Sequence, residues 1–322
     1  MTARVFVEAP ARLHFGVLDL RGDLGRRFGG IGAAVPAPSV LVEATAAATL
    51  EAVGPESERA FEFARRYREF NRLESGARLV VHRVIPAHAG LGSGTQLGLA
   101  VARALAEIHG RSTDVTGLAR AVGRGRRSGV GTWTFARGGF VLEGGRKDGE
   151  DGVAPLLAQI AIPDDWRYVV AIPHGARGLS GEGEVAAFAR LPPPPGREVE
   201  QVAHVVLMQL LPALAEADLA GFGAALDQVQ RITGGWWSSI QGGAYAQGPA
   251  TLLVQRLREW GAVGVGQSSW GPAVYGLAPD QGRAADLAAR TRTVLGSEGV
   301  VFEGGFAHQG ARVLRGSGFQ SG

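Results

Sequence analysis

Apolar residues recur at helical spacing in several segments of the chain. Between residues 96 and 109, Leu97, Val101 and Leu105 share one face, and this spacing predicts an amphipathic helix. The same kind of pattern predicts further helices over residues 55–70, 116–122, 199–211, 219–232, 249–260 and 281–295. Short apolar runs predict strands over residues 5–7, 40–44, 78–85, 140–143, 168–172, 263–265, 273–278 and 300–302.

The order of these elements indicates the fold class. Strands and helices do not alternate as they do in a doubly wound parallel sheet, so we expect an α+β fold. The charged, glycine-containing stretch 144–152 predicts a boundary between an N-terminal domain over 1–150 and a C-terminal domain over 151–322. Four consecutive prolines at 192–195 predict an extended loop, and residues 316–322 predict a frayed tail.

The overall composition limits the classes of protein that remain. The chain has 322 residues, of which 45% are hydrophobic and 20% charged, and this excludes a wholly disordered or coiled-coil protein. The absence of cysteine excludes disulfides, thiolate metal sites and a thiol nucleophile. No apolar stretch is long enough to span a membrane, and the first ten residues lack the apolar segment of a signal peptide. We therefore expect a cytoplasmic protein without a membrane partner.

The positive charge of the chain is carried almost entirely by arginine. The net charge is +3, and Lys147 is the only lysine. Chemistry that needs a lysine, such as a P-loop or a Schiff base, must therefore use Lys147. Two explanations of the arginine content can both hold. One is a GC-rich genome, and the other is a functional need to bind anionic groups bidentately.

A glycine-rich loop lies between a predicted strand and a predicted helix. It runs Gly-Leu-Gly-Ser-Gly-Thr from Gly90 to Thr95, and no acidic residue occurs between Glu74 and Glu107. A helix N-terminus has N–H groups without helical partners and the positive end of the helix dipole, so alternating glycines there can wrap around a phosphate. The alternative is a tight turn without a ligand. The residues that would form the phosphate cradle are Gly90, Gly92, Ser93, Gly94 and Thr95.

A second segment concentrates arginine without acidic compensation. Five arginines occur in eighteen residues, and no Asp or Glu lies between Val115 and Leu142. This pattern favours a site for a phosphate-rich ligand. A solvated basic face and nucleic-acid binding are the alternatives, although the segment contains no nucleic-acid-binding motif and few aromatic residues. The arginines are Arg120, Arg124, Arg126, Arg127 and Arg137.

The N-terminal segment shows strand alternation with polar residues on one side. Apolar Leu13, Phe15 and Val17 alternate with Arg12, His14 and Gly16. His14 is a candidate acid–base group or hydrogen-bonding ring in a pocket, and a purely structural role is the alternative. Two further arginines, Arg26 and Arg27, enter another glycine-rich loop.

Taken together, these segments resemble the GHMP kinase superfamily. Residues 86–100 resemble its phosphate loop, residues 10–16 its first motif, and residues 264–276 its C-terminal glycine motif. The resemblance implies a two-lobed fold, with an N-terminal ribosomal-protein-S5-like domain and a C-terminal ferredoxin-like α/β sandwich. It also implies a metabolic enzyme that acts on a small molecule rather than on nucleic acid.

Within the superfamily, four segments are most similar to the β-ribofuranosylaminobenzene 5′-phosphate synthases of methanopterin biosynthesis. They are residues 12–16, 88–96, 123–131 and 264–272. One difference from the kinases supports this closer resemblance. Kinases of the superfamily commonly carry Ser-Gly-x-Asp after the phosphate loop, whereas this chain has Ser128-Gly129-Val130-Gly131. Glycine cannot accept a proton, so the base of phosphoryl transfer is missing. A serine of the kinase loop is also replaced, by Gly94.

The resemblance implies a decarboxylating phosphoribosyl transferase. Such enzymes join phosphoribosyl pyrophosphate to 4-aminobenzoate or 4-hydroxybenzoate and release CO₂ and pyrophosphate. It further implies Mg²⁺ as cofactor and a homodimer. An ATP-dependent kinase and a non-catalytic phosphate sensor are the alternatives. The candidate catalytic residues are Arg12, His14, His88, Arg126 and Arg127. The candidate substrate-binding residues are Arg26, Arg27, Gly90, Gly92, Ser93, Gly94, Thr95, Gln96, Arg124, Gln267, Ser268, Ser269 and Trp270, and Asp19 is the candidate metal ligand. Trp236 and Trp237 are expected to be structural or to lie at a subunit contact.

Overall fold

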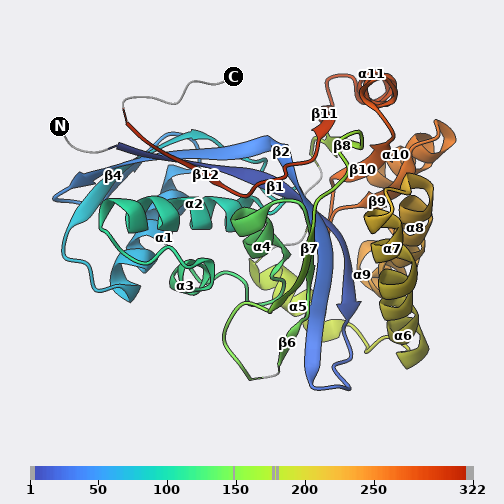
Figure 1. The fold of residues 1–322 in the computed structure, drawn as a ribbon, viewed down its shortest axis with the longest axis horizontal. Helices are drawn as coiled ribbons and strands as arrows, with labels where there is room; N and C mark the ends of the chain where they lie inside the picture. Colours follow the sequence, from blue (N-terminus) through green and yellow to red (C-terminus); the bar gives the residue numbers. More distant parts are fainter. Residues whose placement is uncertain (1–3, 148, 176–177, 179–180, 317–322) are drawn as a thin grey trace.

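Two sheets organise the chain, and their strand pairs are antiparallel except for β3 with β4. The computed structural model describes residues 4–147, 149–175, 178 and 181–316. An eight-stranded sheet contains the path β12-β1-β2-β4-β3, with β5 and β6 paired to β2 and β7 paired to β5. A second sheet has four strands in the order β11-β8-β10-β9. Figure 1 shows the first sheet with α1–α3 beneath it, and the second sheet with most of the later helices to the right.

The first sheet is built around two strands that are much longer than the sequence predicted. Strand β1 covers Arg4–Asp19 and β2 covers Arg26–Ala47, and they pair over most of their length. Their register shifts between His14 and Gly16, which accommodates Phe15 as a bulge. Bulges redirect side chains and often lie beside functional sites. The remaining strands of this sheet are β3 (Glu51–Val53), β4 (Gly76–Arg83), β5 (Phe140–Glu143), β6 (Arg146–Lys147), β7 (Leu156–Ile160) and β12 (Arg312–Arg315).

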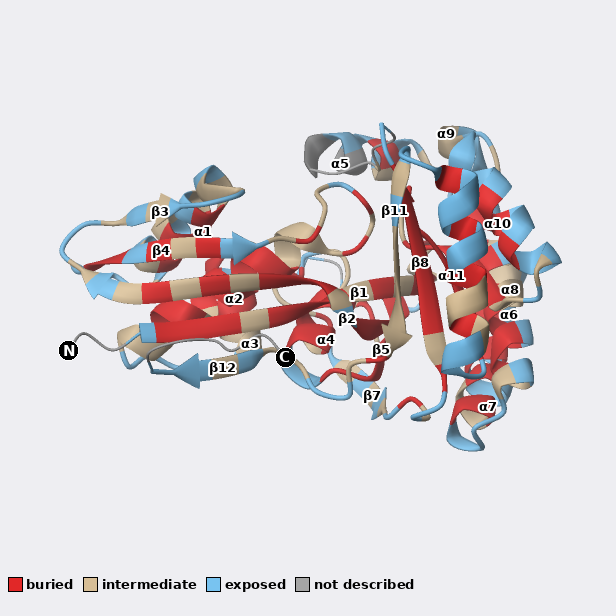
Figure 2. Ribbon diagram, turned by 90° about the horizontal axis from the view of Figure 1, so that it is seen from above, coloured by how far each residue is buried: buried red, intermediate tan, exposed pale blue. Residues whose placement is uncertain are grey.

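Helices cover one face of this sheet, and the core lies between the two layers. The helices are α1 (Ser57–Phe70), α2 (Ser93–Ile108), α3 (Val115–Ala121) and α4 (Val130–Arg137). Helix α2 is apolar almost all round, which explains its central position, with Leu97, Val101 and Leu105 all buried. Figure 2 shows buried residues along β1, β2 and α2, with exposed residues toward the outer strands β3 and β12.

The second sheet has apolar residues on both faces. Its strands are β8 (Arg167–Pro173), β9 (Val263–Gln267), β10 (Val274–Ala278) and β11 (Gly299–Gly305). Tyr168 and Val170 join the main core, whereas Val169 and Ala171 join a second apolar cluster with α10 (Pro249–Glu259) and α11 (Gln281–Leu295). This alternation is the two-residue period of a strand covered on both sides.

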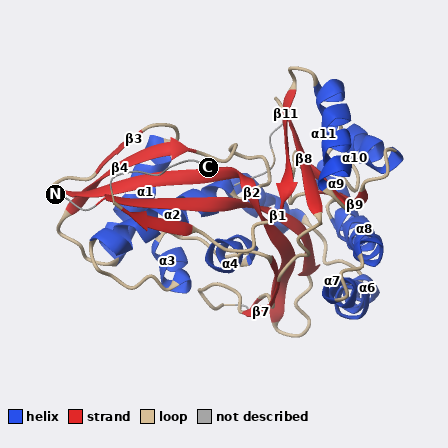
Figure 3. Cartoon of the chain, turned by 45° about the horizontal axis from the view of Figure 1, so that its top comes forward, coloured by secondary structure: helices blue, strands red, loops and turns tan. Residues whose placement is uncertain are grey.

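The other helices of the C-terminal half pack mainly toward the main core. They are α5 (Gly181–Arg190), α6 (Gly196–Val205), a short π-helix over Val206–Leu210, α7 (Leu211–Ala215), α8 (Leu219–Trp236) and α9 (Ser238–Gln241). Phe222 of α8 packs edge-on against Phe15 of β1, with ring centroids 6.3 Å apart. Figure 3 shows α6, α7 and α8 to the right of the lower parts of β1 and β2. The two halves therefore share one apolar core.

The predicted α+β class and two-lobed arrangement are confirmed. Several local predictions were wrong, because glycine content and polar patterning hid regular structure. The segment 123–139 contains helix α4, which the sequence analysis did not predict. Strands β3, β7 and β12 and helix α5 were also missed. The predicted frayed tail falls on 317–322, outside the described residues, apart from Gly316, whose N–H donates to the Arg4 carbonyl.

The two sheets do not divide at residue 150. Strand β7 follows that position yet pairs with β5, and β12 near the C-terminus pairs with β1. The chain thus returns to its first sheet after completing the second. Among the described residues, no helix is both long and apolar enough to cross a membrane.

Candidate active site

A cavity of about 380 Å³ opens where the two halves meet. Its lining comes from β1, the start of β2, the start of α2, the loop before α4, α5, α8 and the segment after β9. Four arginines line it, and no Asp or Glu does so among the residues that the structure describes. The lining arginines, here called the arginine cluster, are Arg12, Arg124, Arg126 and Arg127.

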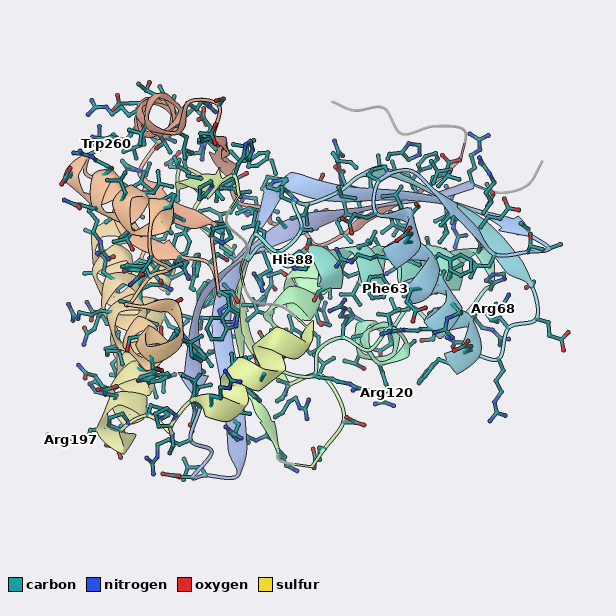
Figure 4. The ribbon with its side chains drawn as sticks, turned by 180° about the vertical axis from the view of Figure 1, so that it is seen from behind. Phe63, Arg68, His88, Arg120, Arg197 and Trp260 are labelled. Atoms are coloured by element: carbon teal, nitrogen blue, oxygen red, sulfur yellow. The ribbon has the colours of Figure 1, made fainter. Side chains whose placement is uncertain are left out.

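The glycine-rich loop is in contact with the arginine cluster. A side chain at Gly94 would place its Cβ 2.7 Å from Arg59 Nη2 and 3.0 Å from Arg124 Nη2. At Gly92, which has a positive φ of 78°, the Cβ would approach the Arg12 side chain to 3.1 Å. These glycines therefore let guanidinium groups gather at the N-terminus of α2, the positive end of its dipole. This dense positive charge would attract an anionic ligand. Arg124 also lies 4.9 Å from the ring centre of Phe63, which Figure 4 labels on α1.

The C-terminal glycine motif meets the same loop. The Ser268 hydroxyl donates to the Gly90 carbonyl over 2.7 Å and accepts the His14 N–H over 2.9 Å. Gly90 has a φ of 80°, and a side chain there would collide with the Ser268 carbonyl, 2.1 Å from the Cβ position. The Arg12 guanidinium also donates to the Gly90 carbonyl. Three motifs that are far apart in the sequence thus meet at one point.

An amide network holds the motif that follows β9. The Gln267 N–H donates to Gln230 Oε1 of α8 over 3.0 Å, and Gln267 Oε1 accepts from the Ala246 N–H over 2.7 Å. Gln267 Nε2 donates to the Ser269 carbonyl over 3.0 Å and to Gln241 Oε1 over 3.2 Å. Because the side-chain amide is occupied on both sides, Gln267 shapes the cavity wall more than it offers free donors to a ligand.

Aromatic side chains form another part of the cavity wall. Trp237 and Trp270 lie 4.7 Å apart between ring centres, and Phe188 packs edge-on against both, at 5.2 and 5.7 Å. Phe28 packs edge-on against Phe188 at 5.5 Å. The four rings, here called the aromatic cluster, form a wall suited to a flat, apolar ligand. Arg127 connects the two clusters, because its guanidinium lies 5.9 Å from the centre of the Phe188 ring.

His14 lies in the cavity as a neutral ring. Burial and, to a lesser extent, the positive charge of Arg12 lower its pKa to about 3. Its Nε2 lies 3.4 Å from the Ser128 hydroxyl. At neutral pH the ring can therefore donate one hydrogen bond and accept another.

The sequence comparisons agree with this geometry. Residues 57–139 match the GHMP kinases N terminal domain, and residues 210–295 match the GHMP kinases C terminal domain. A beta-ribofuranosylphenol 5′-phosphate synthase from Methanothermobacter thermautotrophicus is 32% identical over 98% of this chain and 100% of its own length. The chain belongs to the beta-ribofuranosylphenol 5′-phosphate synthase family. A family member from Archaeoglobus fulgidus is 35% identical, over 84% of this chain and 87% of the relative.

Solved structures place the synthase family on the kinase fold. Phosphomevalonate kinase from Streptococcus pneumoniae superposes with a TM-score of 0.69 at 14% identity, covering 94% of this chain and 99% of the kinase. Homoserine kinase from Cytophaga hutchinsonii gives 0.66 at 16% identity, covering 97% of each chain. These similarities establish the fold alone, since fold does not imply function.

Where the kinases of the superfamily commonly carry aspartate, this member of the synthase family has Gly131 in the cavity wall. A Cβ there would lie 3.2 Å from Thr95 Cγ2, and Gln96 Nε2 donates to the Gly131 carbonyl over 2.9 Å. Thr95 and Gln96 thus lie close to Gly131, and this position carries no carboxylate. Gln96 acts behind the wall, because its side chain is fully buried and does not line the cavity.

About half of the predicted site residues meet in the cavity. Those that line it are Arg12, His14, Thr95, Arg124, Arg126, Arg127, Gln267, Ser269 and Trp270. Gly90, Gly92, Gly94 and Ser268 support the wall through the contacts described above, and Ser93 begins α2. The roles assigned to all of these residues stay predictions.

The remaining candidates lie outside the wall. Arg26 donates to the Gly145 carbonyl over 3.1 Å, and Arg27 donates to the Leu20 carbonyl over 3.1 Å. Asp19 accepts the N–H groups of Arg21 and Gly22 in the turn after β1. His88 is exposed, and Figure 4 labels it near the junction of the two halves.

Sequence reasoning missed much of the aromatic cluster. Phe188 lies on a helix that was not predicted, and Phe28 was not singled out within its glycine-rich segment. Trp237 was assigned a structural role or a subunit contact, yet it lines the cavity. Its neighbour Trp236 points elsewhere and donates from Nε1 to Glu198 Oε2 over 2.7 Å. A signal was available, because tandem tryptophans at a helix end usually turn to different surroundings.

Proposed function

We propose that the chain joins phosphoribosyl pyrophosphate to a para-substituted benzoate, with loss of CO₂ and pyrophosphate, to give a C-riboside 5′-phosphate. One observation carries the proposal: a single cavity combines an arginine cluster, without a lining carboxylate, and an aromatic cluster. The first suits a ligand with several phosphates, and the second suits an arene. The names of the relatives support a phenol product, which favours 4-hydroxybenzoate over 4-aminobenzoate.

The proposed reaction follows from the two clusters. The diphosphate leaves ribose C1 with the electron pair of the C–O bond, and the arginine cluster stabilises the leaving charge. The ring carbon that carries the carboxylate attacks C1 while the aromatic cluster holds the ring in position. The bond to the carboxylate then breaks, CO₂ leaves, and its electron pair restores aromaticity.

Mg²⁺ stays a prediction that the protein's own donors do not favour. Among the described residues, no group of three or more His, Asp or Glu side chains could hold a metal ion. No carboxylate among them lines the cavity, and Asp19 is engaged in its turn. Mg²⁺ prefers oxygen ligands and often keeps water and substrate phosphates. The residues present therefore do not form a magnesium site of their own, and the steps above depend on the arginines.

The direct test uses carboxyl-labelled acids. The protein is incubated with phosphoribosyl pyrophosphate and either 4-hydroxybenzoate or 4-aminobenzoate, with and without Mg²⁺, and released CO₂ and pyrophosphate are measured. We expect equal amounts of both products, strictly dependent on phosphoribosyl pyrophosphate. A parallel incubation with ATP measures ADP. ADP formation without CO₂ release would replace the proposal by the kinase alternative, which only the shared fold supports. Light scattering tests the expected homodimer.

A further inference from the structure

A buried carboxylate stands behind the cavity. Glu143, the last residue of β5, is fully buried and does not line the cavity. Its Oε1 accepts the Gly129 N–H over 3.0 Å, and its Oε2 accepts the Gly145 N–H over 2.9 Å. The Ser128 side chain interacts with this carboxylate as well. A fully buried glutamate is rare and needs a reason.

Ser128 connects this carboxylate to the cavity. Its side chain interacts with Glu143, and its hydroxyl lies 3.4 Å from His14 Nε2. Gly30 of β2 adjoins both groups, since a Cβ there would lie 3.3 Å from His14 Nε2 and 3.4 Å from Glu143 Oε1. Glycine at this position leaves space in which the imidazole and the carboxylate approach each other. His14 and Ser128 both line the cavity, and Glu143 lies behind them.

The cavity wall contains few groups that can move a proton. Arginine does not release its proton in proteins. Among the described residues of the wall, His14 is the one side chain with an ordinary pKa near neutrality. His14 is therefore the group of the described wall best suited to receive a proton from a ligand in this cavity.

Resting on the proposed function, we propose that His14, Ser128 and Glu143 form a proton relay for the para substituent of the arene. As the ring carbon attacks ribose C1, the para O–H bond breaks and its electrons form the C=O bond of a quinonoid ring. The proton goes to the free nitrogen of His14, the Nε2 proton goes to Ser128, and the Ser128 proton goes to Glu143. When CO₂ leaves, the released electron pair restores the aromatic ring, and the three transfers reverse to protonate the phenolate.

The protonation properties of the two end groups agree with this direction. The pKa of His14, at about 3, means that the ring transmits a proton without retaining it. Burial raises the pKa of Glu143 to about 7, although hydrogen bonds from Gly145, Gly129 and Ser128 oppose the rise. A carboxylate with such a pKa can accept and return a proton near neutral pH.

The variants separate a relay from a merely structural carboxylate. Ser128→Ala breaks the connection but keeps both backbone hydrogen bonds of Glu143, and Glu143→Gln removes the terminal acceptor. Glu43→Gln is the matched control, because Glu43 is a largely buried carboxylate of the same sheet, bonded to Arg4 and His82 outside the cavity. We expect Ser128→Ala and Glu143→Gln to lower kcat by about 100-fold, the lower limit usual for acid–base catalysis, with little change in KM. Glu43→Gln should keep the wild-type kcat.

The decisive readout varies the acidity of the substrate. Fluorine beside the hydroxyl of 4-hydroxybenzoate makes the para proton easier to remove. The kcat deficit of each relay variant, taken as the ratio to wild type on the same substrate, should shrink with the fluorinated acid. A purely structural role for Glu143 predicts a ratio that does not depend on the substrate, and that result would overturn the relay. An undiminished kcat in Ser128→Ala would also overturn it. Failure of the proposed function is distinct, because wild type would then release no CO₂ from either acid.

Discussion

The arginine cluster and the aromatic cluster line the same cavity but are assembled differently. Three of the four arginines come from one short stretch, residues 124–127, and a glycine-rich loop adjoins them. The four rings come from β2, α5, the end of α8 and the segment after β9. The arginine cluster thus comes mostly from residues that are close in the sequence, whereas the aromatic cluster depends on the tertiary structure.

This difference indicates how the site divides its work. Guanidinium groups act on a ligand through charge and directed hydrogen bonds, and they tolerate modest displacement. An aromatic wall acts through shape, so it requires several segments to be held in place together. We therefore expect changes in the arginine cluster to affect the phosphoribosyl substrate, and changes in the aromatic cluster to affect the arene.

The largest effect is expected from Arg126→Ala and Arg127→Ala. Each removes a charged donor worth about 1.5–3 kcal/mol, so kcat/KM for phosphoribosyl pyrophosphate should fall about 10- to 100-fold per variant. Initial rates with varied phosphoribosyl pyrophosphate measure the effect. Arg120→Ala is the control, since Arg120 is exposed on α3, as labelled in Figure 4, and does not line the cavity. Wild-type kinetics in both variants would show that these arginines form only a solvated face.

Gly131→Asp should weaken the site by roughly tenfold without creating a kinase. The new carboxylate would stand in the cavity wall beside Thr95, where it repels the diphosphate, although the arginine cluster partly neutralises it. A repulsion of this kind reaches about 1–4 kcal/mol at 4 Å, depending on the local dielectric constant. Pyrophosphate and ADP release are measured in parallel, with no ADP expected. Undiminished pyrophosphate release would place residue 131 away from the reacting centre.

Trp237→Ala should raise KM for the arene several-fold and leave KM for phosphoribosyl pyrophosphate unchanged. Aromatic contacts of this type are worth about 0.5–1.5 kcal/mol each beyond the area that they bury. The neighbouring Trp236→Phe is the control, because Trp236 bonds to Glu198 and does not line the cavity. If Trp237→Ala changed both KM values equally, the assignment of the two clusters to two substrates would be wrong.

Gly94→Ser is expected to have the smallest effect. The added side chain would push the guanidinium ends of Arg59 and Arg124, and displacing such flexible groups costs about 0.5–1.5 kcal/mol. KM for phosphoribosyl pyrophosphate should therefore rise by less than about tenfold, with KM for the arene unchanged. Gly235→Ser on α8 is a control, because nothing lies within 4 Å of its Cβ position and the residue does not line the cavity. A lower KM in Gly94→Ser would show that the serine hydroxyl serves the ligand directly.

The sequence identified the charged half of the site because its residues are close in the chain. Arg124, Arg126 and Arg127 were apparent as one uncompensated run, and the alternation around His14 correctly placed Arg12, His14 and Gly16 on one side of a strand. The fold class and the lobes followed from motifs in a recognisable order. Each of these features involves residues that are close in the chain, so it can be recognised in the sequence itself.

The aromatic cluster and the burial of Glu143 depend on tertiary contacts, which local sequence patterns do not contain. Phe188 reaches Trp270 only when α5 crosses the cavity, and Arg59 reaches Gly94 from a helix that seemed merely amphipathic. Glu143 is the last residue of the predicted strand 140–143. The pattern did not predict its burial, because its partners Gly129, Gly145 and Ser128 come from outside that strand. Strand lengths were underestimated because glycine, alanine and proline in β1 and β2 weaken the apolar alternation.

The pairing of β1 with β12 has a consequence for biosynthesis. On one side β1 pairs with β2, which follows it directly in the chain, but Val5–Glu8 at its other edge pair with residues 312–315, which follow all the other described strands. Ser268, which joins His14 to Gly90, also emerges late. A nascent chain thus carries an open strand edge at β1 until β12 has been made, which is the kind of surface that invites aggregation. This part of the first sheet therefore closes only after the second sheet has been made, because β8–β11 all precede β12 in the chain.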